Sequence, residues 1–73
     1  MEKEINIAKK VGANLKAARM MKGLTQTQLA KELNKYQSDY SEYETGVIQL
    51  DYEKILYLCK RLDITPNDLF DMN

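Results

Sequence analysis

The chain has 73 residues, 44% of them hydrophobic, and a net charge of zero, so we expect residues 1–73 to form one small soluble domain. It contains no histidine and one cysteine, Cys59, which excludes an intramolecular disulfide, a metal site and a histidine-assisted nucleophile. We therefore expect no enzymatic activity, no cofactor and no metal, and no small-molecule ligand is evident. No apolar run approaches the roughly 20 residues that span a bilayer, and no signal-peptide core is present, so the expected location is the cytoplasm, with no membrane partner.

A first helix is predicted from about Glu4 to Lys22, and Gly23 follows where a left-handed residue commonly ends a helix. Its inward face is marked by apolar residues at intervals of three and four, namely Ile7, Ala8, Val11, Leu15 and Ala18. Residues 1–22 carry six Lys/Arg and two Glu, whereas residues 23–73 carry five Lys/Arg and nine Asp/Glu. This excess predicts either a basic face for an anionic partner or an ordinary solvated surface.

Residues 25–46 predict two short helices joined by a tight bend. Thr25 and Gln28 have the spacing of a capping box, which marks the start of a helix over Gln26–Leu33. Its apolar stripe is Leu29, Ala30 and Leu33. Asn34 follows, and asparagine tolerates the positive φ that is needed where a helix stops and turns.

The second of these helices is predicted over Gln37–Thr45. Tyr40 and Tyr43 fall three residues apart, and we interpret them as core residues rather than base-stacking residues. Gly46 stands where the helix should end. Two short helices with the small residue Ala30 at their crossing are the pattern of a helix-turn-helix, over about residues 25–46.

Two more helices complete the prediction. Asp51 is a plausible N-cap for a helix over Tyr52–Leu62, and Thr65 caps a short fifth helix with Pro66 at its first position. The buried face of this pair is expected to comprise Ile55, Leu58, Cys59, Leu62, Leu69 and Phe70. The fold class is therefore all-α, a compact five-helix bundle.

The segments GLTQTQLAKELN and QSDYSEYETG together resemble the Cro/repressor-type (XRE-like) helix-turn-helix family of phage and bacterial regulators. The resemblance runs from about Val11 to Phe70. It is carried by residues that match in register without a gap: Arg19, Gly23 to Gln26, Leu29, Ala30, Tyr43, Glu44, Gly46, Ile64 to Pro66, Leu69 and Phe70. It implies a lambda-repressor-like DNA-binding domain and a sequence-specific transcriptional regulator, most simply a repressor.

The resemblance also assigns roles to residues. The helix over 37–45 enters the major groove of double-stranded DNA. The implied base readers are Tyr36, Gln37, Ser38 and Glu42. The implied phosphate contacts are Gln26, Lys35, Lys16 and Lys22. The Gln37 amide has the donor and acceptor geometry that pairs with adenine N6 and N7. Glu42 is either a base reader or only a surface charge. Asp39 is interpreted as a negative charge that interacts favourably with the helix dipole at the start of the helix.

The family also implies a buried ion pair between Arg19 and Glu44.

Three features of the sequence depart from the family pattern. Tyr36 stands where a Ser or Thr usually caps the reading helix, so Ser38 could cap instead and shift its start by two residues. The loop VIQL, residues 47–50, is apolar where the family is often basic, and it either closes over the core or faces a partner. Cys59 replaces a common alanine, and we interpret it as a small buried residue rather than a reactive thiol.

Family members bind near-palindromic operators as homodimers, because one reading helix contacts too few base pairs to select a site. Apolar residues that the core does not clearly need suggest the dimer surface: Leu56, Tyr57, Met72 and Ile48. Alternatively, these four residues are scattered surface hydrophobes with no role in association, or the dimer forms only on DNA. The neutral charge, the acids on the reading helix and the VIQL loop favour a different function, a protein-interaction module such as an antirepressor or assembly partner that kept the fold without strong DNA binding.

Overall fold

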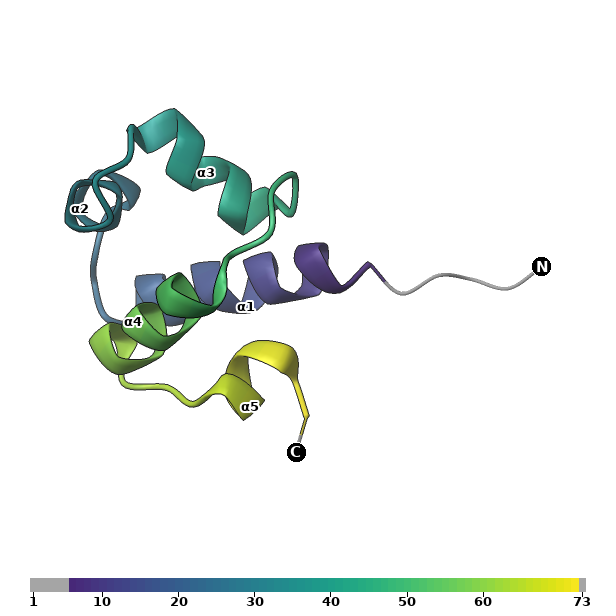
Figure 1. The fold of residues 1–73 in the computed structure, drawn as a ribbon. Coiled ribbons are helices and arrows are strands. Elements are labelled where there is room, and N and C mark those ends of the chain that lie inside the picture. Colours follow the sequence, from purple (N-terminus) through teal and green to yellow (C-terminus); the bar gives the residue numbers. More distant parts are fainter. Residues whose placement is uncertain (1–5, 73) are drawn as a thin grey trace.

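The structure, a computed structural model, describes residues 6–72, which form five helices and no strand (Figure 1). The helices are α1 (Ile7–Met21), α2 (Gln26–Glu32), α3 (Gln37–Thr45), α4 (Tyr52–Leu62) and α5 (Pro66–Phe70). The predicted all-α fold class is therefore confirmed.

The longest helix, α1, lies in the middle of the molecule. It packs against α3 on one side and α5 on the other, while α2 packs against α3, and α4 against α5 (Figure 1). Gly12 makes the close approach of α1 and α3 possible, because a Cβ atom at this position would overlap the backbone oxygens of Tyr43 and Glu44.

The helices share one hydrophobic core, to which each of them contributes. Its buried members are Val11, Leu15, Leu29, Ala30, Tyr40, Tyr43, Leu58, Cys59, Leu62 and Leu69. Tyr40 and Tyr43 meet edge to face with ring centroids 6.0 Å apart, an arrangement that aromatic pairs favour. Both tyrosines and Cys59 thus occupy the core positions that the sequence predicts for them.

Most helix boundaries agree with the sequence. The first helix begins at Ile7 because Asn6 caps it, accepting a hydrogen bond from the Lys9 backbone nitrogen at 3.0 Å; the predicted start at Glu4 lies outside the described residues. The second helix ends at Glu32, one residue earlier than expected. The bounds predicted for α3 and α4 are confirmed.

The bend between α2 and α3 also follows the prediction. The capping box of Thr25 and Gln28 is complete, and Asn34 has the positive φ, 61°, that was expected of it. The alternative start of α3 with Ser38 as its cap is wrong, because the helix begins at Gln37 and Tyr36 occupies the N-cap position without a side-chain hydrogen bond. Among residues 6–72, no helix is long and apolar enough to cross a membrane.

Candidate nucleic-acid interface

A buried ion pair joins the last turn of α1 to the last turn of α3. Arg19 Nε donates to Glu44 Oε2 at 2.6 Å, and Arg19 Nη2 donates to Oε1 at 3.2 Å. The Arg19 side chain is 11% exposed and that of Glu44 2% exposed. Arg19 Nη1 also donates to the Leu24 carbonyl oxygen at 2.7 Å, which fixes the chain between α1 and α2. This is the pair expected from the sequence, and its geometry is bidentate.

Two further donors satisfy the Glu44 carboxylate. The hydroxyl of Tyr40 donates to Oε2 at 2.8 Å, and Gln26 Nε2 donates to Oε1 at 2.9 Å. Burial disfavours the charged form of Glu44, but the hydrogen bonds from Arg19, Gln26 and Tyr40 outweigh burial, so its pKa lies below the usual value. Burial and the bond to Glu44 raise the pKa of Tyr40. We call the four side chains of Arg19, Gln26, Tyr40 and Glu44 the polar hub.

The polar hub reaches the surface through one more hydrogen bond. Gln37, the first residue of α3, donates from Nε2 to Gln26 Oε1 at 2.5 Å. Gln26, the first residue of α2, therefore bridges the buried Glu44 to the exposed Gln37. In this way the N-termini of both helices are tied together at the place where the sequence predicts a base reader and a phosphate contact.

The outer face of α3 carries other predicted readers. Ser38 and Glu42 are four residues apart and so share one face of the helix, opposite the buried Tyr40 and Tyr43. Tyr36, directly before the helix, is 80% exposed. The structure thus brings all four predicted base readers to the exposed side of α3 or to its start.

An open hollow of about 650 Å³ adjoins the start of α3. It is lined by residues of α2, the turn and the first turn of α3, namely Thr27, Ala30, Lys31, Asn34, Lys35, Tyr36, Gln37 and Asp39. Lys35 therefore lies beside the predicted readers, and Lys31 adds a second cation there, although no motif in the sequence marks it. Asp39 places an opposing charge at the same edge.

Lys16 and Lys22, the two lysines that are predicted to contact phosphates from the first helix, have different surroundings. Lys16 comes four residues after Gly12 and three before Arg19, so it is on the side of α1 that faces α3. Lys22, in contrast, approaches Asp63 after α4 at 4.0 Å. The structure therefore places Lys16 on the side of α1 toward α3, whereas Lys22 lies near the end of α4.

A family model described as a helix-turn-helix domain matches residues 12–73. The chain belongs to the helix-turn-helix domain family. No curated protein matches it. Membership confirms the resemblance to Cro/repressor-type regulators and indicates a DNA-binding regulator.

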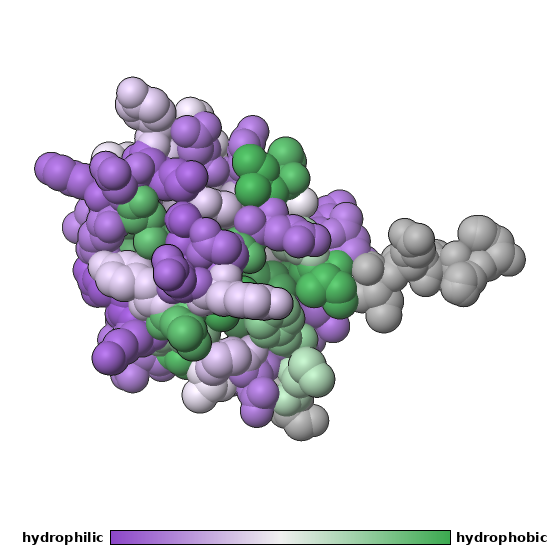
Figure 2. Space-filling model, viewed as in Figure 1, coloured by the Kyte–Doolittle hydropathy of each residue, from purple (hydrophilic) through white to green (hydrophobic). Residues whose placement is uncertain are grey.

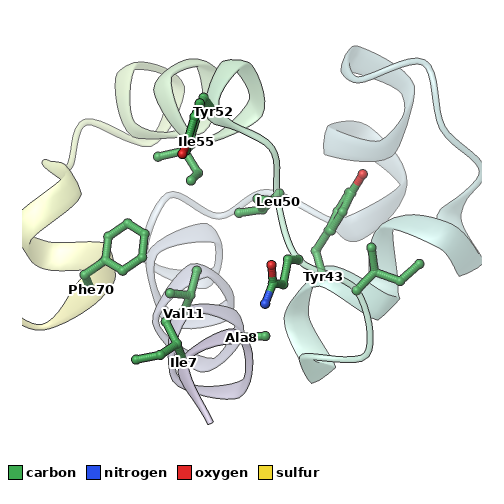
Figure 3. Close-up of a pocket in the computed structure, with 10 residues that line it drawn as sticks. Ile7, Ala8, Val11, Tyr43, Leu50, Tyr52, Ile55 and Phe70 are labelled. Atoms are coloured by element: carbon green, nitrogen blue, oxygen red, sulfur yellow. The ribbon is translucent and has the colours of Figure 1, made fainter. Parts of the chain in front are cut away.

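A second surface of this helix-turn-helix protein is apolar. Figure 2 shows green side chains gathered beside the start of α1 and the loop after α3, whereas the surface over α2 and the start of α3 is mainly polar. A groove of about 190 Å³ opens there, lined by Ile7, Ala8, Val11, Tyr43, Ile48, Gln49, Leu50, Tyr52, Ile55 and Phe70 (Figure 3). Four helices and the loop contribute to the groove (Figure 3). Ile7 and Val11 come from α1, Tyr43 from α3, Ile55 from α4 and Phe70 from α5.

The four residues predicted for a dimer surface do not gather in one place. Ile48 lines the groove, and it is 45% exposed. Tyr57 instead donates its hydroxyl to Glu32 of α2 at 2.7 Å, where Arg61 also binds Glu32. Leu56 and Met72 are exposed, but neither lines the groove. The sequence alone could not separate these sides, because α4 has apolar residues at both edges of its buried stripe.

Several contributions could not be read from the sequence. Ile7 was expected in the core, but it is 49% exposed and lines the groove, since α1 extends beyond the helices that cover it. Tyr52 lines the same groove and was not singled out. The bond between Gln26 and Gln37 joins residues eleven positions apart, and only their helix-start positions hinted at it. In the described part of the chain, no cluster of three potential metal ligands is found, and burial raises the pKa of the Cys59 thiol.

Proposed function

We propose that this protein is a sequence-specific transcriptional regulator that reads the major groove of double-stranded DNA with α3. The observation that carries the proposal is the bond by which Gln26 holds Gln37 at the exposed start of α3. A base reader must be held in a defined direction to distinguish one base from another. Ser38 and Glu42 share the outward face of α3, so this face offers several polar groups and no bulky apolar group to the major groove of DNA.

Phosphate contacts are assigned to groups around the same end of the molecule. Lys35 and Lys31 line the hollow beside Gln37, and Lys16 faces the same side from α1. The Gln26 amide nitrogen has two hydrogens, one of which is bound to Glu44, so the other is available to a phosphate oxygen. Because the net charge is zero and Asp39 lies nearby, few phosphates are neutralised and the salt dependence of binding should be modest.

The proposed working form is a symmetric homodimer on a near-palindromic operator, in the cytoplasm. The occupant of the apolar groove is then a second copy of this chain. A twofold interface brings the same patch of each copy together, and a chain without net charge does not repel its own copy. A dimer bound across an operator excludes other proteins from that DNA, which makes repression the simplest outcome.

The test begins with selection of duplexes from a random library by the purified protein. Fluorescence anisotropy across a salt series then compares the selected duplex with a scrambled one for the wild type, Gln37→Ala and Lys35→Ala. Gln37→Ala should weaken binding to the selected duplex by roughly 1–3 kcal/mol and relax preference at one base step. Lys35→Ala should weaken both duplexes similarly and reduce the salt slope by about one. Equal losses on both duplexes in both variants would contradict the assignment of reader and anchor.

The apolar groove and the two acids on the outer part of α3, Asp39 and Glu42, favour one other function, a protein-interaction module such as an antirepressor. That function predicts that no duplex is selected even at low salt, although the protein is folded by circular dichroism. A selected sequence with the expected Gln37→Ala effect excludes it as the main activity.

A further inference from the structure

A line of hydrogen bonds runs from the buried interior to the exposed start of α3. Arg19 and Tyr40 donate to Glu44, Gln26 donates to Glu44, and Gln37 donates to Gln26. Within residues 6–72, no buried side-chain nitrogen or oxygen lacks a partner, so each link in this line is satisfied. The line has a direction, because every step points its N–H or O–H toward Glu44.

The direction follows from the chemistry of Glu44. An ionised carboxylate can only accept hydrogen bonds, and the pKa of Glu44 is held below its usual value. Gln26 must therefore turn its NH₂ group toward Glu44, which leaves its oxygen facing outward. That oxygen accepts from Gln37, so one hydrogen of the Gln37 NH₂ group is used inside the protein. Its second N–H and its carbonyl oxygen remain for a ligand.

The side of the Gln37 amide that is left free determines which base it can pair with. One acceptor and one donor side by side match adenine, which offers the N6 donor and the N7 acceptor. If Gln26 were reversed, its NH₂ group would hold the Gln37 oxygen, and the Gln37 NH₂ group would turn outward. A donor edge of that kind matches guanine O6 and N7.

We propose that Glu44 is a positioning residue for base selection: acting through Gln26, its carboxylate sets which side of the Gln37 amide is presented to DNA. The proposal rests on the proposed reading role of α3, and it adds a specificity determinant that is buried and never contacts a base. The ion pair between α1 and α3 then has two effects, stabilising the fold and orienting the reader.

Glu44→Gln tests the proposal. Each carboxylate oxygen of Glu44 receives two donors, but those at Oε2 are the closer ones, Arg19 Nε at 2.6 Å and the Tyr40 hydroxyl at 2.8 Å. At Oε1, Arg19 Nη2 lies 3.2 Å away and the other donor is the Gln26 amide, which can reverse, so the new amide should keep its oxygen at the Oε2 position. Its NH₂ group would then face Gln26, which should reverse and in turn reverse Gln37. In the variant we expect affinity for the wild-type operator to fall about tenfold or more, and preference at one base pair of each half-site to change from A·T toward G·C. Preference at the other positions should not change.

Tyr40→Phe is the matched control. It also removes a hydrogen bond from the polar hub and lowers stability, but it leaves the Glu44 carboxylate in place. Base preference in this variant should remain that of the wild type. An equal change of preference in Tyr40→Phe and Glu44→Gln would overturn the proposal, because general loosening of the hub would then explain both.

Two further measurements keep the test decisive. Neutron diffraction from crystals of the free protein locates amide deuterons, and it should show the Gln26 NH₂ group facing residue 44 in the wild type and facing Gln37 in Glu44→Gln. An unchanged orientation would overturn this proposal alone, whereas failure of the wild type to bind any duplex would overturn the proposed function. If Glu44→Gln does not fold, Gln26→Met keeps the Arg19–Glu44 pair but breaks the line, and it should bind A·T and G·C operators with similar affinity. Retention of the wild-type preference in Gln26→Met would refute the relay.

Discussion

Two ion pairs of this protein have similar bonding but different surroundings. Glu44 receives four hydrogen bonds from three side chains and has a side chain only 2% exposed. Glu32 receives bonds from Arg61 and Tyr57, but at the surface, where its side chain is 28% exposed. Water can replace the partners of Glu32 and cannot readily replace those of Glu44. The two pairs therefore give a matched comparison within one fold.

Arg19→Met should lower the free energy of unfolding by roughly 3–5 kcal/mol, because it leaves the buried Glu44 charge without its main partner. Arg61→Met at the exposed pair should cost no more than about 1 kcal/mol. Urea unfolding followed by circular dichroism measures both. Equal midpoints for the two variants would show that burial does not determine the cost.

The Glu44 carboxylate should make the stability of the protein depend on pH. The pKa of Glu44 is lower in the folded protein than its usual 4.5, so in acid the unfolded chain binds protons more readily than the folded one. The stabilisation is therefore complete above that usual value and is lost as pH falls through the folded pKa. Urea midpoints measured from neutral pH down to about pH 2 should fall more steeply for the wild type than for Glu44→Gln. Parallel curves would contradict this assignment.

Features of this protein that depend on a few neighbouring residues could be predicted from the sequence, whereas contacts between helices mostly could not. The bounds of α3 and α4 follow from local signals, since Gly46 ends one helix and Asp51 caps the other. The polar hub was half predicted: the pairing of Arg19 with Glu44 follows the family pattern, but the bond from Gln26 to Glu44 depends on how α2 packs against α3. The bond by which Gln37 reaches the hub depends on the same packing. Periodicity shows which face of a helix is apolar, not how far a neighbouring helix covers it, and for that reason Ile7 was misplaced.

The close packing of α1 against α3 at Gly12 can be tested by a single substitution. Gly12→Ala should lower stability by about 1–3 kcal/mol, because the new methyl group overlaps the backbone of α3. In an ordinary helix interior the same substitution would raise stability by about 1 kcal/mol. Thermal unfolding decides between the two signs, and a stabilised Gly12→Ala variant would mean that α1 and α3 are less closely packed.

The start of α3 is a helix terminus without a side-chain cap. Tyr36→Ser should supply one, since a serine hydroxyl at this position accepts from the backbone two or three residues on, and stability should rise by about 0.5–2 kcal/mol. The same change removes the exposed ring beside Gln37 and should weaken DNA binding. Tyr36→Ala separates the effects, because it removes the ring without adding a cap. A serine variant no more stable than the alanine variant would contradict the capping argument.

At the scale of the whole molecule, the two candidate surfaces lie at opposite ends of one helix. Gln37 begins α3, the loop that follows its last turn lines the apolar groove, and nine residues of helix separate them by about 13 Å. The groove combines the loop with residues of α1, α4, α5 and the last turns of α3, so no local pattern in the sequence reveals it. This separation lets a partner copy occupy the groove while the start of α3 contacts DNA.

Light scattering should therefore find a dimer at the protein concentrations that saturate the selected duplex. Ile48→Glu places a charge in the groove and should give a monomer with weakened operator binding. Met21→Glu is the control, since Met21 is also hydrophobic, is more exposed, and lies at the other end of α1 from the groove. A wild-type monomer that binds one half-site in a one-to-one complex would refute the dimer, and equal effects of both variants would refute the groove as its interface.

The outward face of α3 has a consequence for how such a protein can change over generations. Ser38 is exposed and Glu42 half-buried, and neither is a member of the hydrophobic core, whereas Tyr40, Tyr43 and Glu44 on the opposite side are buried. Substitutions on the outward face should therefore cost little stability, so many sequences there are compatible with a folded protein. A duplicated copy of the gene could acquire a new operator through a few such substitutions without passing through an unfolded intermediate. Glu44 would limit that freedom, because a change at this one buried position alters recognition and stability together.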